Sequence, residues 1–133
     1  YSFIPILRKL MRIVVIDDNE LHLQLIAYLL RKESYDVITF KTGLEALNWL
    51  KDNRADVVLI DIQLPIMNGI EILNEIKLDE RHSKMKKIAI TAQQKYEGKT
   101  FSEIGFDGHI LKPINSKKFA EELRNFLNNQ NNN

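Results

Sequence analysis

Residues 57–69 read Val-Val-Leu-Ile-Asp-Ile-Gln-Leu-Pro-Ile-Met-Asn-Gly, and this stretch decides the fold class. The run over residues 57–60 is apolar without alternation, which is typical of a strand buried on both faces of a parallel sheet. An acid, Asp61, follows directly, and Gly69 punctuates the start of the next element. In open α/β sheets ligands bind beyond the carboxyl ends of the strands, so Asp61 is a first candidate for a functional residue.

The same kind of apolar run recurs four more times, at residues 13–16, 37–40, 88–91 and 109–111. Stretches with helical spacing lie between and after these runs, and their apolar positions are Leu25, Ile26 and Leu29, then Leu44, Leu47 and Leu50, then Ile70 and Leu73, and finally Phe119, Leu123, Phe126 and Leu127. Alternating strands and helices predict right-handed βαβ units. We therefore expect an α/β fold, doubly wound, with five parallel strands and helices on both faces.

Composition excludes several classes of protein. The 133 residues fit about one domain of ~150 residues. With no cysteine, the chain can have no disulfide, no thiolate metal site and no cysteine nucleophile. A net charge of +1 gives no strong attraction to nucleic acid, and no apolar run is long enough to span a membrane.

The two ends differ in composition from the part between them. Residues 1–10 are apolar and basic, which indicates a leader or an upstream linker, whereas Met11 stands where a free-standing domain would begin. Residues 128–133 are Asn and Gln only and form a polar tail. The expected domain spans residues 11–127.

Polar groups follow four of the five expected strands. Asp17 and Asp18 follow the first, Asp61 ends the third, Thr91 with Ala92 ends the fourth, and Lys112 with Pro113 follows the fifth. Taken singly, each has a structural explanation. An Asp after a strand is most often a helix cap, a Thr is common at a strand end, and Lys112-Pro113 alone would be a turn. Three carboxylates at neighbouring strand ends, however, repel one another unless a cation or proton intervenes. Mg²⁺ fits such a group, and a lysine and a hydroxyl facing it favour a small polyanion as the ligand.

These motifs resemble the receiver domain of two-component response regulators, the family of the bacterial chemotaxis receiver. The resemblance covers residues 11–127 and rests on all the motifs occurring in order, each at a strand end. It implies a flavodoxin-like (βα)5 fold with strand order 2-1-3-4-5, in which the first and third strands are neighbours.

The resemblance also implies a role for each site residue. Asp61 would be phosphorylated, forming an acyl phosphate. Mg²⁺ or Mn²⁺ would be held by Asp61 and Asp18, by Asp17 largely through water, and by the backbone carbonyl of Gln63. Lys112 and Thr91 would contact phosphoryl oxygens from positions beside solvent, Ala92 would leave the site open, and Pro113 would follow a cis peptide bond.

Some positions depart from the family pattern or stay open. His109 stands where the family often has Tyr or Phe, and it is equally well explained as a half-covered strand residue or as a switch residue. Gln63 and Gln93 flank the phosphorylation site, where they would either orient or block the attacking water. The segment between Thr91 and Lys112 is about one residue short, so its helix is expected to be short or shifted. Leu21 and Leu23 are candidates for a partner-docking patch.

The function that follows is a phosphoryl-accepting signalling switch with Mg²⁺-dependent self-phosphorylation and autodephosphorylation, rather than a metabolic enzyme. The expected partners are a sensor histidine kinase or a histidine phosphotransfer domain, in the cytoplasm, and an upstream domain of the same chain is a further candidate. No direct contact with nucleic acid or membrane is expected. A phosphohydrolase with an aspartyl nucleophile, a flavin-binding electron carrier and a pseudo-receiver are the alternatives. The first two require an Asp-x-Asp motif or a Ser/Thr/Gly-rich loop after the first strand, where this chain has Asp17-Asp18-Asn19-Glu20. The complete set of site residues argues against the third.

Overall fold

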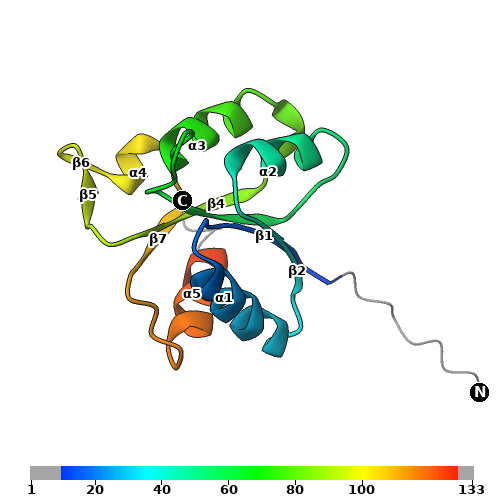
Figure 1. Cartoon of the computed structure of the whole chain (residues 1–133), viewed down its shortest axis with the longest axis vertical. Helices are drawn as coiled ribbons and strands as arrows, with labels where there is room; N and C mark the ends of the chain where they lie inside the picture. Colours follow the sequence, from blue (N-terminus) through cyan, green and yellow to red (C-terminus); the bar gives the residue numbers. More distant parts are fainter. Residues whose placement is uncertain (1–9, 129–133) are drawn as a thin grey trace, which may run out of the picture.

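The structure is a computed structural model that describes residues 10–128. Its central sheet has five parallel strands in the order β2-β1-β3-β4-β7 (Figure 1). The strands are β1 (Arg12–Ile16), β2 (Asp36–Phe40), β3 (Val57–Asp61), β4 (Lys86–Thr91) and β7 (Gly108–Leu111). Since β7 is the fifth strand of this sheet, the expected doubly wound fold and its 2-1-3-4-5 order are confirmed.

Helices cover both faces of the sheet. One face carries α1 (Glu20–Lys32) and α5 (Phe119–Asn128), and the other carries α2 (Gly43–Leu50), α3 (Gly69–Lys77) and α4 (Phe101–Ile104) (Figure 1). A 3-10 turn, η1 (Glu80–His82), leads from α3 toward β4. Among the residues described, no helix is long and apolar enough to cross a bilayer.

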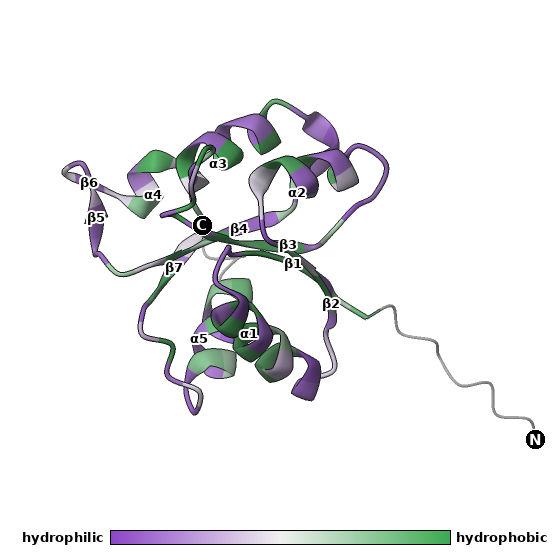
Figure 2. Cartoon of the chain, in the orientation of Figure 1, coloured by the Kyte–Doolittle hydropathy of each residue, from purple (hydrophilic) through white to green (hydrophobic). Residues whose placement is uncertain are grey.

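Two apolar cores lie on either side of the sheet. Alternate residues of each strand enter them, so that Val15 faces α1 and α5 while Val14 and Ile16 face α2 and α3. Figure 2 shows the result as hydrophobic strands between helices whose outer faces are hydrophilic. Burial on both faces explains why the strands read as continuous apolar runs.

The helices begin at side chains that cap them. Asn19, Thr42, Asn68 and Thr100 each accept backbone N–H groups at the start of a helix, and Asn68 and Thr100 do so in reciprocal capping boxes with Glu71 and Glu103. Such caps satisfy N–H groups that have no partner within the helix. Two of these capped starts, those of α1 and α2, come within a few residues of the ends of β1 and β2, so the caps also fix the loops at the carboxyl edge of the sheet.

The segment after β4 differs most from a regular βα unit. A short antiparallel hairpin, β5 (Lys95–Tyr96) and β6 (Lys99–Thr100), precedes α4, which has only four residues. Glu97 and Gly98 form its turn, both with positive φ. A short helix was expected here, but the hairpin was not.

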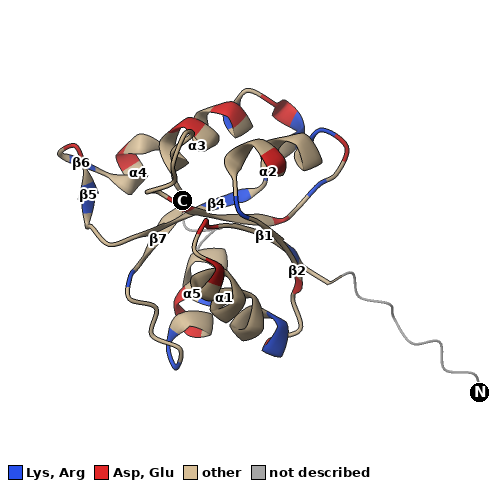
Figure 3. Ribbon diagram, in the orientation of Figure 1, with Lys and Arg blue, Asp and Glu red and all other residues tan. Residues whose placement is uncertain are grey.

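The expected leader over residues 1–10 and polar tail over residues 128–133 lie, apart from Leu10 and Asn128, outside the described residues. Between them, charged residues of both signs are spread over the helices, with basic residues at the start of β4 (Figure 3).

Candidate functional site: an acid pocket at the carboxyl edge of the sheet

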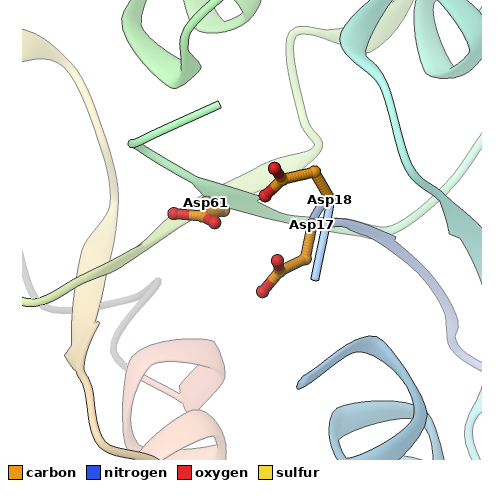
Figure 4. Close-up of side chains that lie close together, drawn as sticks. All are labelled: Asp17, Asp18 and Asp61. Carbon is orange, nitrogen blue, oxygen red and sulfur yellow. The ribbon is translucent and has the colours of Figure 1, made fainter. Parts of the chain in front are cut away.

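Two neighbouring strands bring three carboxylates together. In the parallel register of β1 and β3, Ile16 pairs with Ile60, so Asp17 and Asp61 follow at the same level of the sheet. Asp18 directly follows Asp17 in the chain. Carboxylate oxygens of Asp17, Asp18 and Asp61, one from each, lie within 4.8 Å of one another (Figure 4). We call these three residues the acid pocket.

Backbone N–H groups hold two of the three carboxylates. Asp17 Oδ1 accepts a hydrogen bond from the N–H of Asn19 at 2.8 Å, and Asp61 Oδ1 accepts one from the N–H of Gln63 at 3.1 Å. Asn19 in turn caps α1. Each of these two acids is therefore fixed by the turn that follows its own strand, which leaves its second oxygen, Oδ2, to face the pocket.

Lys112 supplies the positive charge of the site. It follows β7, and its Nζ lies 3.1 Å from Asp61 Oδ2 and 3.7 Å from Asp17 Oδ2. Its backbone N–H donates to the carbonyl of Thr91 at 2.7 Å, which ties it to the end of β4. The peptide bond between Lys112 and Pro113 is cis, the isomer that the family resemblance implies.

The pocket has an excess of negative charge. Burial raises the pKa of the Asp17 carboxyl, and the nearby charge of Asp61 raises it further, against the lowering effects of the Asn19 N–H, Lys112 and His22. Asp17 is 1 % exposed, and its Oδ2 has no hydrogen-bond partner among the described residues. A buried acceptor without a donor, beside two more carboxylates, is a suitable ligand for a hard divalent cation. The residues present thus fit Mg²⁺ or Mn²⁺, the ions expected from the sequence.

Thr91 lies at the end of β4 and is 4 % exposed, so its expected position beside solvent is wrong. It pairs with Leu111 of β7 in the parallel register, so it lies within the sheet rather than beyond its edge. Its hydroxyl accepts a hydrogen bond from the N–H of Gln93 at 3.1 Å and lies 3.3 Å from the Gln93 carbonyl. The hydroxyl therefore organises the turn after β4, and Ala92 and Gln93 in this turn are exposed.

We expect replacement of Thr91 by alanine to lower the free energy of unfolding by about 1 kcal/mol, the usual worth of such a hydrogen bond. The fold should survive, because only a hydroxyl and a methyl group are removed. Thermal unfolding of Thr91→Ala beside Thr91→Ser, which keeps the hydroxyl, measures the effect. Equal losses in both variants would contradict a role for this hydroxyl.

His109 connects β7 to the segment that departs from the regular fold. Its ring centroid lies 5.4 Å from that of Phe101 in α4, and its Nε2 lies 3.3 Å from Gln94 Oε1. Gln94 directly follows Gln93, whose backbone is held by Thr91. A continuous set of contacts therefore runs from Thr91 to α4 through His109. The sequence singled out His109 but gave no sign of Gln94 or Phe101.

The two leucines predicted for a docking patch do not lie on the same surface. Leu21 is 76 % exposed, but Leu23 is 5 % exposed and packs in the core with Ile26 and Leu30. The prediction that Leu23 belongs to a docking surface is therefore wrong. The signal was available in the sequence, because residues 23, 26 and 30 share one helical face. Gln63, by contrast, is exposed beside Asp61, as a residue flanking the site would be.

Comparison with known proteins assigns the chain to a family. The sequence model of the family described as response regulator receiver domain matches residues 13–124. The chain belongs to this family. The receiver is 33 % identical over 116 residues to the polar-differentiation response regulator DivK of Brucella anthropi. The matched stretch covers 86 % of this chain and 94 % of that protein.

Solved structures agree with this assignment. A CheY-like response regulator receiver domain protein from Methanospirillum hungatei shares 32 % identity and a TM-score of 0.79, covering 93 % of this chain and 98 % of that one. The receiver domain of the sensor histidine kinase PA1611 from Pseudomonas aeruginosa, 24 % identical with a TM-score of 0.79, covers 90 % of this chain and 99 % of its own. That structure has a magnesium ion coordinated in its active-site cleft. The receiver described here is accordingly a module of two-component signal transduction.

Proposed function

We propose that this receiver accepts a phosphoryl group on Asp61 from a phosphohistidine partner. The observation that carries the proposal is the position of Asp61, whose Oδ1 is held by the Gln63 N–H and whose Oδ2 faces Lys112 at 3.1 Å. Asp61 is thus a fixed carboxylate beside both a cation site and an ammonium group. Phosphoryl transfer depends mostly on positioning and charge neutralisation, which these groups supply.

The reaction balances as a simple displacement. A carboxylate oxygen of Asp61 forms a bond to phosphorus while the phosphorus–nitrogen bond of the phosphohistidine breaks, and the imidazole nitrogen keeps the electron pair. Mg²⁺ or Mn²⁺, held by Asp17, Asp18 and Asp61, would neutralise charge on the transferring group. The magnesium in the Pseudomonas aeruginosa receiver supports this choice of ion. Lys112 and Thr91 would then bind phosphoryl oxygens.

The response would travel along the contacts already described. If the Thr91 side chain rotates to bring its hydroxyl to a phosphoryl oxygen, the hydroxyl leaves the Gln93 carbonyl, to which it donates, and the Gln93 N–H, from which it accepts. The turn that carries Gln94 is then released, and with it the contact between Gln94 and His109. Through this sequence of changes His109 would act as a switch residue, and the altered surface would lie at α4 and the β5–β6 hairpin.

The same site would remove the phosphoryl group by hydrolysis, when water attacks phosphorus and the Asp61 carboxylate leaves. Gln63 and Gln93 are exposed beside this path, and their amides would set the rate of attack. We further propose a cytoplasmic receiver over residues 11–127. Its partner is a sensor histidine kinase or a histidine phosphotransfer domain. This partner would contact the exposed Leu21 of α1. An upstream domain of the same chain is a further candidate for the partner.

Acetyl phosphate tests the proposal without the unknown partner. With Mg²⁺ present, we expect the mass of the intact protein to rise by one phosphoryl group in the wild type and to stay unchanged in Asp61→Asn. EDTA should abolish the increase. The variant Asp56→Asn, altered at the opposite edge of the sheet, is the control and should label like the wild type. Labelling of Asp61→Asn to the same extent would overturn the assignment.

A further inference from the structure

Two buried polar atoms without hydrogen-bond partners face each other beside the acid pocket. One is Asp17 Oδ2 and the other is Nδ1 of His22. They are 3.8 Å apart, which is too far for a hydrogen bond. These are the two buried side-chain atoms without a partner in the part of the chain that the structure describes.

The capped start of α1 directs His22 to this place. His22 is the third residue of the helix, and its N–H donates to the side chain of Asn19 at 3.1 Å. The N–H of Asn19 in turn donates to Asp17. The imidazole is 42 % exposed as a whole, yet its Nδ1 is buried against Asp17. The same turn that holds Asp17 therefore fixes this nitrogen.

Leaving a buried polar atom without a hydrogen bond is destabilising, so two such atoms at one gap indicate a shared ligand. The other charged groups around the gap are Asp18, Asp61 and Lys112. Lys112 lies 3.7 Å from Asp17 Oδ2 but 3.1 Å from Asp61 Oδ2, so it keeps its bond to Asp61 when Asp17 takes another partner.

The spacing suits one cation. Bonds from zinc to imidazole nitrogen and carboxylate oxygen are each about 2.1 Å, so two donors to one tetrahedral ion lie about 3.4 Å apart. The observed 3.8 Å exceeds this by a few tenths of an ångström, which a small rotation of the partly exposed imidazole closes. Imidazole is a good ligand for Zn²⁺ and related transition metals, whereas Mg²⁺ prefers oxygen.

We propose that His22 supplies a nitrogen donor to the acid pocket and shifts its preference from Mg²⁺ toward transition-metal cations of the Zn²⁺ type. This inference rests on the cation site of the proposed function. A Zn²⁺ ion held by Asp17 and His22 competes with Mg²⁺ for Asp17. The receiver would then respond to the balance between the two ions as well as to its kinase.

The test is calorimetric titration of the whole chain with ZnCl₂ and, separately, MgCl₂, at fixed pH and ionic strength. We expect His22→Asn to weaken Zn²⁺ binding by about tenfold or more, a common effect of removing a group that supports a metal site, and to leave Mg²⁺ binding unchanged. His109→Asn is the matched control, since it removes an imidazole outside the pocket, and it should bind both ions like the wild type. His22→Gln gives a second variant should His22→Asn fold poorly.

Nitrogen NMR separates a ligand from a merely structural histidine. Zn²⁺ should shift the Nδ1 resonance of His22 in the wild type, and Mg²⁺ should not. An unshifted Nδ1, or an equal loss of Zn²⁺ affinity in His22→Asn and His109→Asn, would overturn the proposal. If neither wild type nor His22→Asn binds Mg²⁺, the proposed Mg²⁺ site fails, while the difference in Zn²⁺ binding still reports on His22.

Discussion

Gly69→Ala is expected to destabilise the receiver by about 3 kcal/mol, near the upper end for overpacked sites, and so to lower its melting temperature by roughly 10 °C. A Cβ at this position would lie 2.7 Å from the carbonyl oxygen of Asp61 and 2.8 Å from the Cα of Ile62. Both are backbone atoms at the end of β3, so no side chain can rotate away. To relieve the contact, α3 must withdraw from the strand that carries Asp61. Labelling of Asp61 by acetyl phosphate should therefore slow as well.

Gly43→Ala is the matched control, because Gly43 also begins a helix. There the added Cβ would meet Cγ1 and Cδ1 of the buried Ile72 side chain at 2.6 Å but no backbone atom, and a side chain can shift within the core where backbone cannot. We expect a clearly smaller loss of stability, with labelling of Asp61 unchanged. Thermal melting and labelling rates of both variants check this contrast. Similar losses in the two variants would show that backbone contact at Gly69 does not limit the packing of α3.

The central sheet could be predicted because its three inner strands, β1, β3 and β4, are buried on both faces and its edge strands are apolar too. Each reads as an uninterrupted apolar run, and helical stripes between the runs leave few other topologies. The acid pocket followed from the same pattern, since Asp17, Asp18 and Asp61 stand directly after or at the ends of two such runs. Residues whose position depends only on the end of a buried strand are thus accessible from sequence.

Other features depend on contacts between distant segments or on weak local signals. The β5–β6 hairpin has only two residues in each strand, and its turn places Glu97 at positive φ, where Gly or Asn is usual. The contact of His22 with Asp17 joins residues five apart, across the turn between a strand and a helix, and matches no metal-ligand spacing in the sequence. Leu23 was misplaced although it shares one helical face with Ile26 and Leu30, because Leu21 and Leu25 are apolar too and make that face less distinct.

Adding Mg²⁺ at a hundredfold excess over its Kd is expected to stabilise the wild-type receiver by about 2.7 kcal/mol, since the ion binds the folded arrangement and scarcely the unfolded chain. For a domain of this size the melting temperature should rise by roughly 10 °C. The physical reason is the excess negative charge of the acid pocket. Burial and the charge of Asp61 raise the pKa of Asp17, so its ionised form is unfavourable in the metal-free fold. Melting in EDTA and in MgCl₂, at constant ionic strength, measures the shift.

Asp18→Asn should remove most of this response. Asp18 is the exposed member of the acid pocket, so losing its charge costs no packing and slightly relieves repulsion on Asp17 and Asp61. In EDTA the variant should therefore melt at or a little above the wild-type temperature, while gaining little from Mg²⁺. Asp52→Asn, altered on a loop away from the pocket, should respond to Mg²⁺ like the wild type. If Asp18→Asn gains as much from Mg²⁺ as the wild type does, the three carboxylates do not act as one cation site, and Asp61 would have to accept the phosphoryl group with Lys112 as its main source of positive charge.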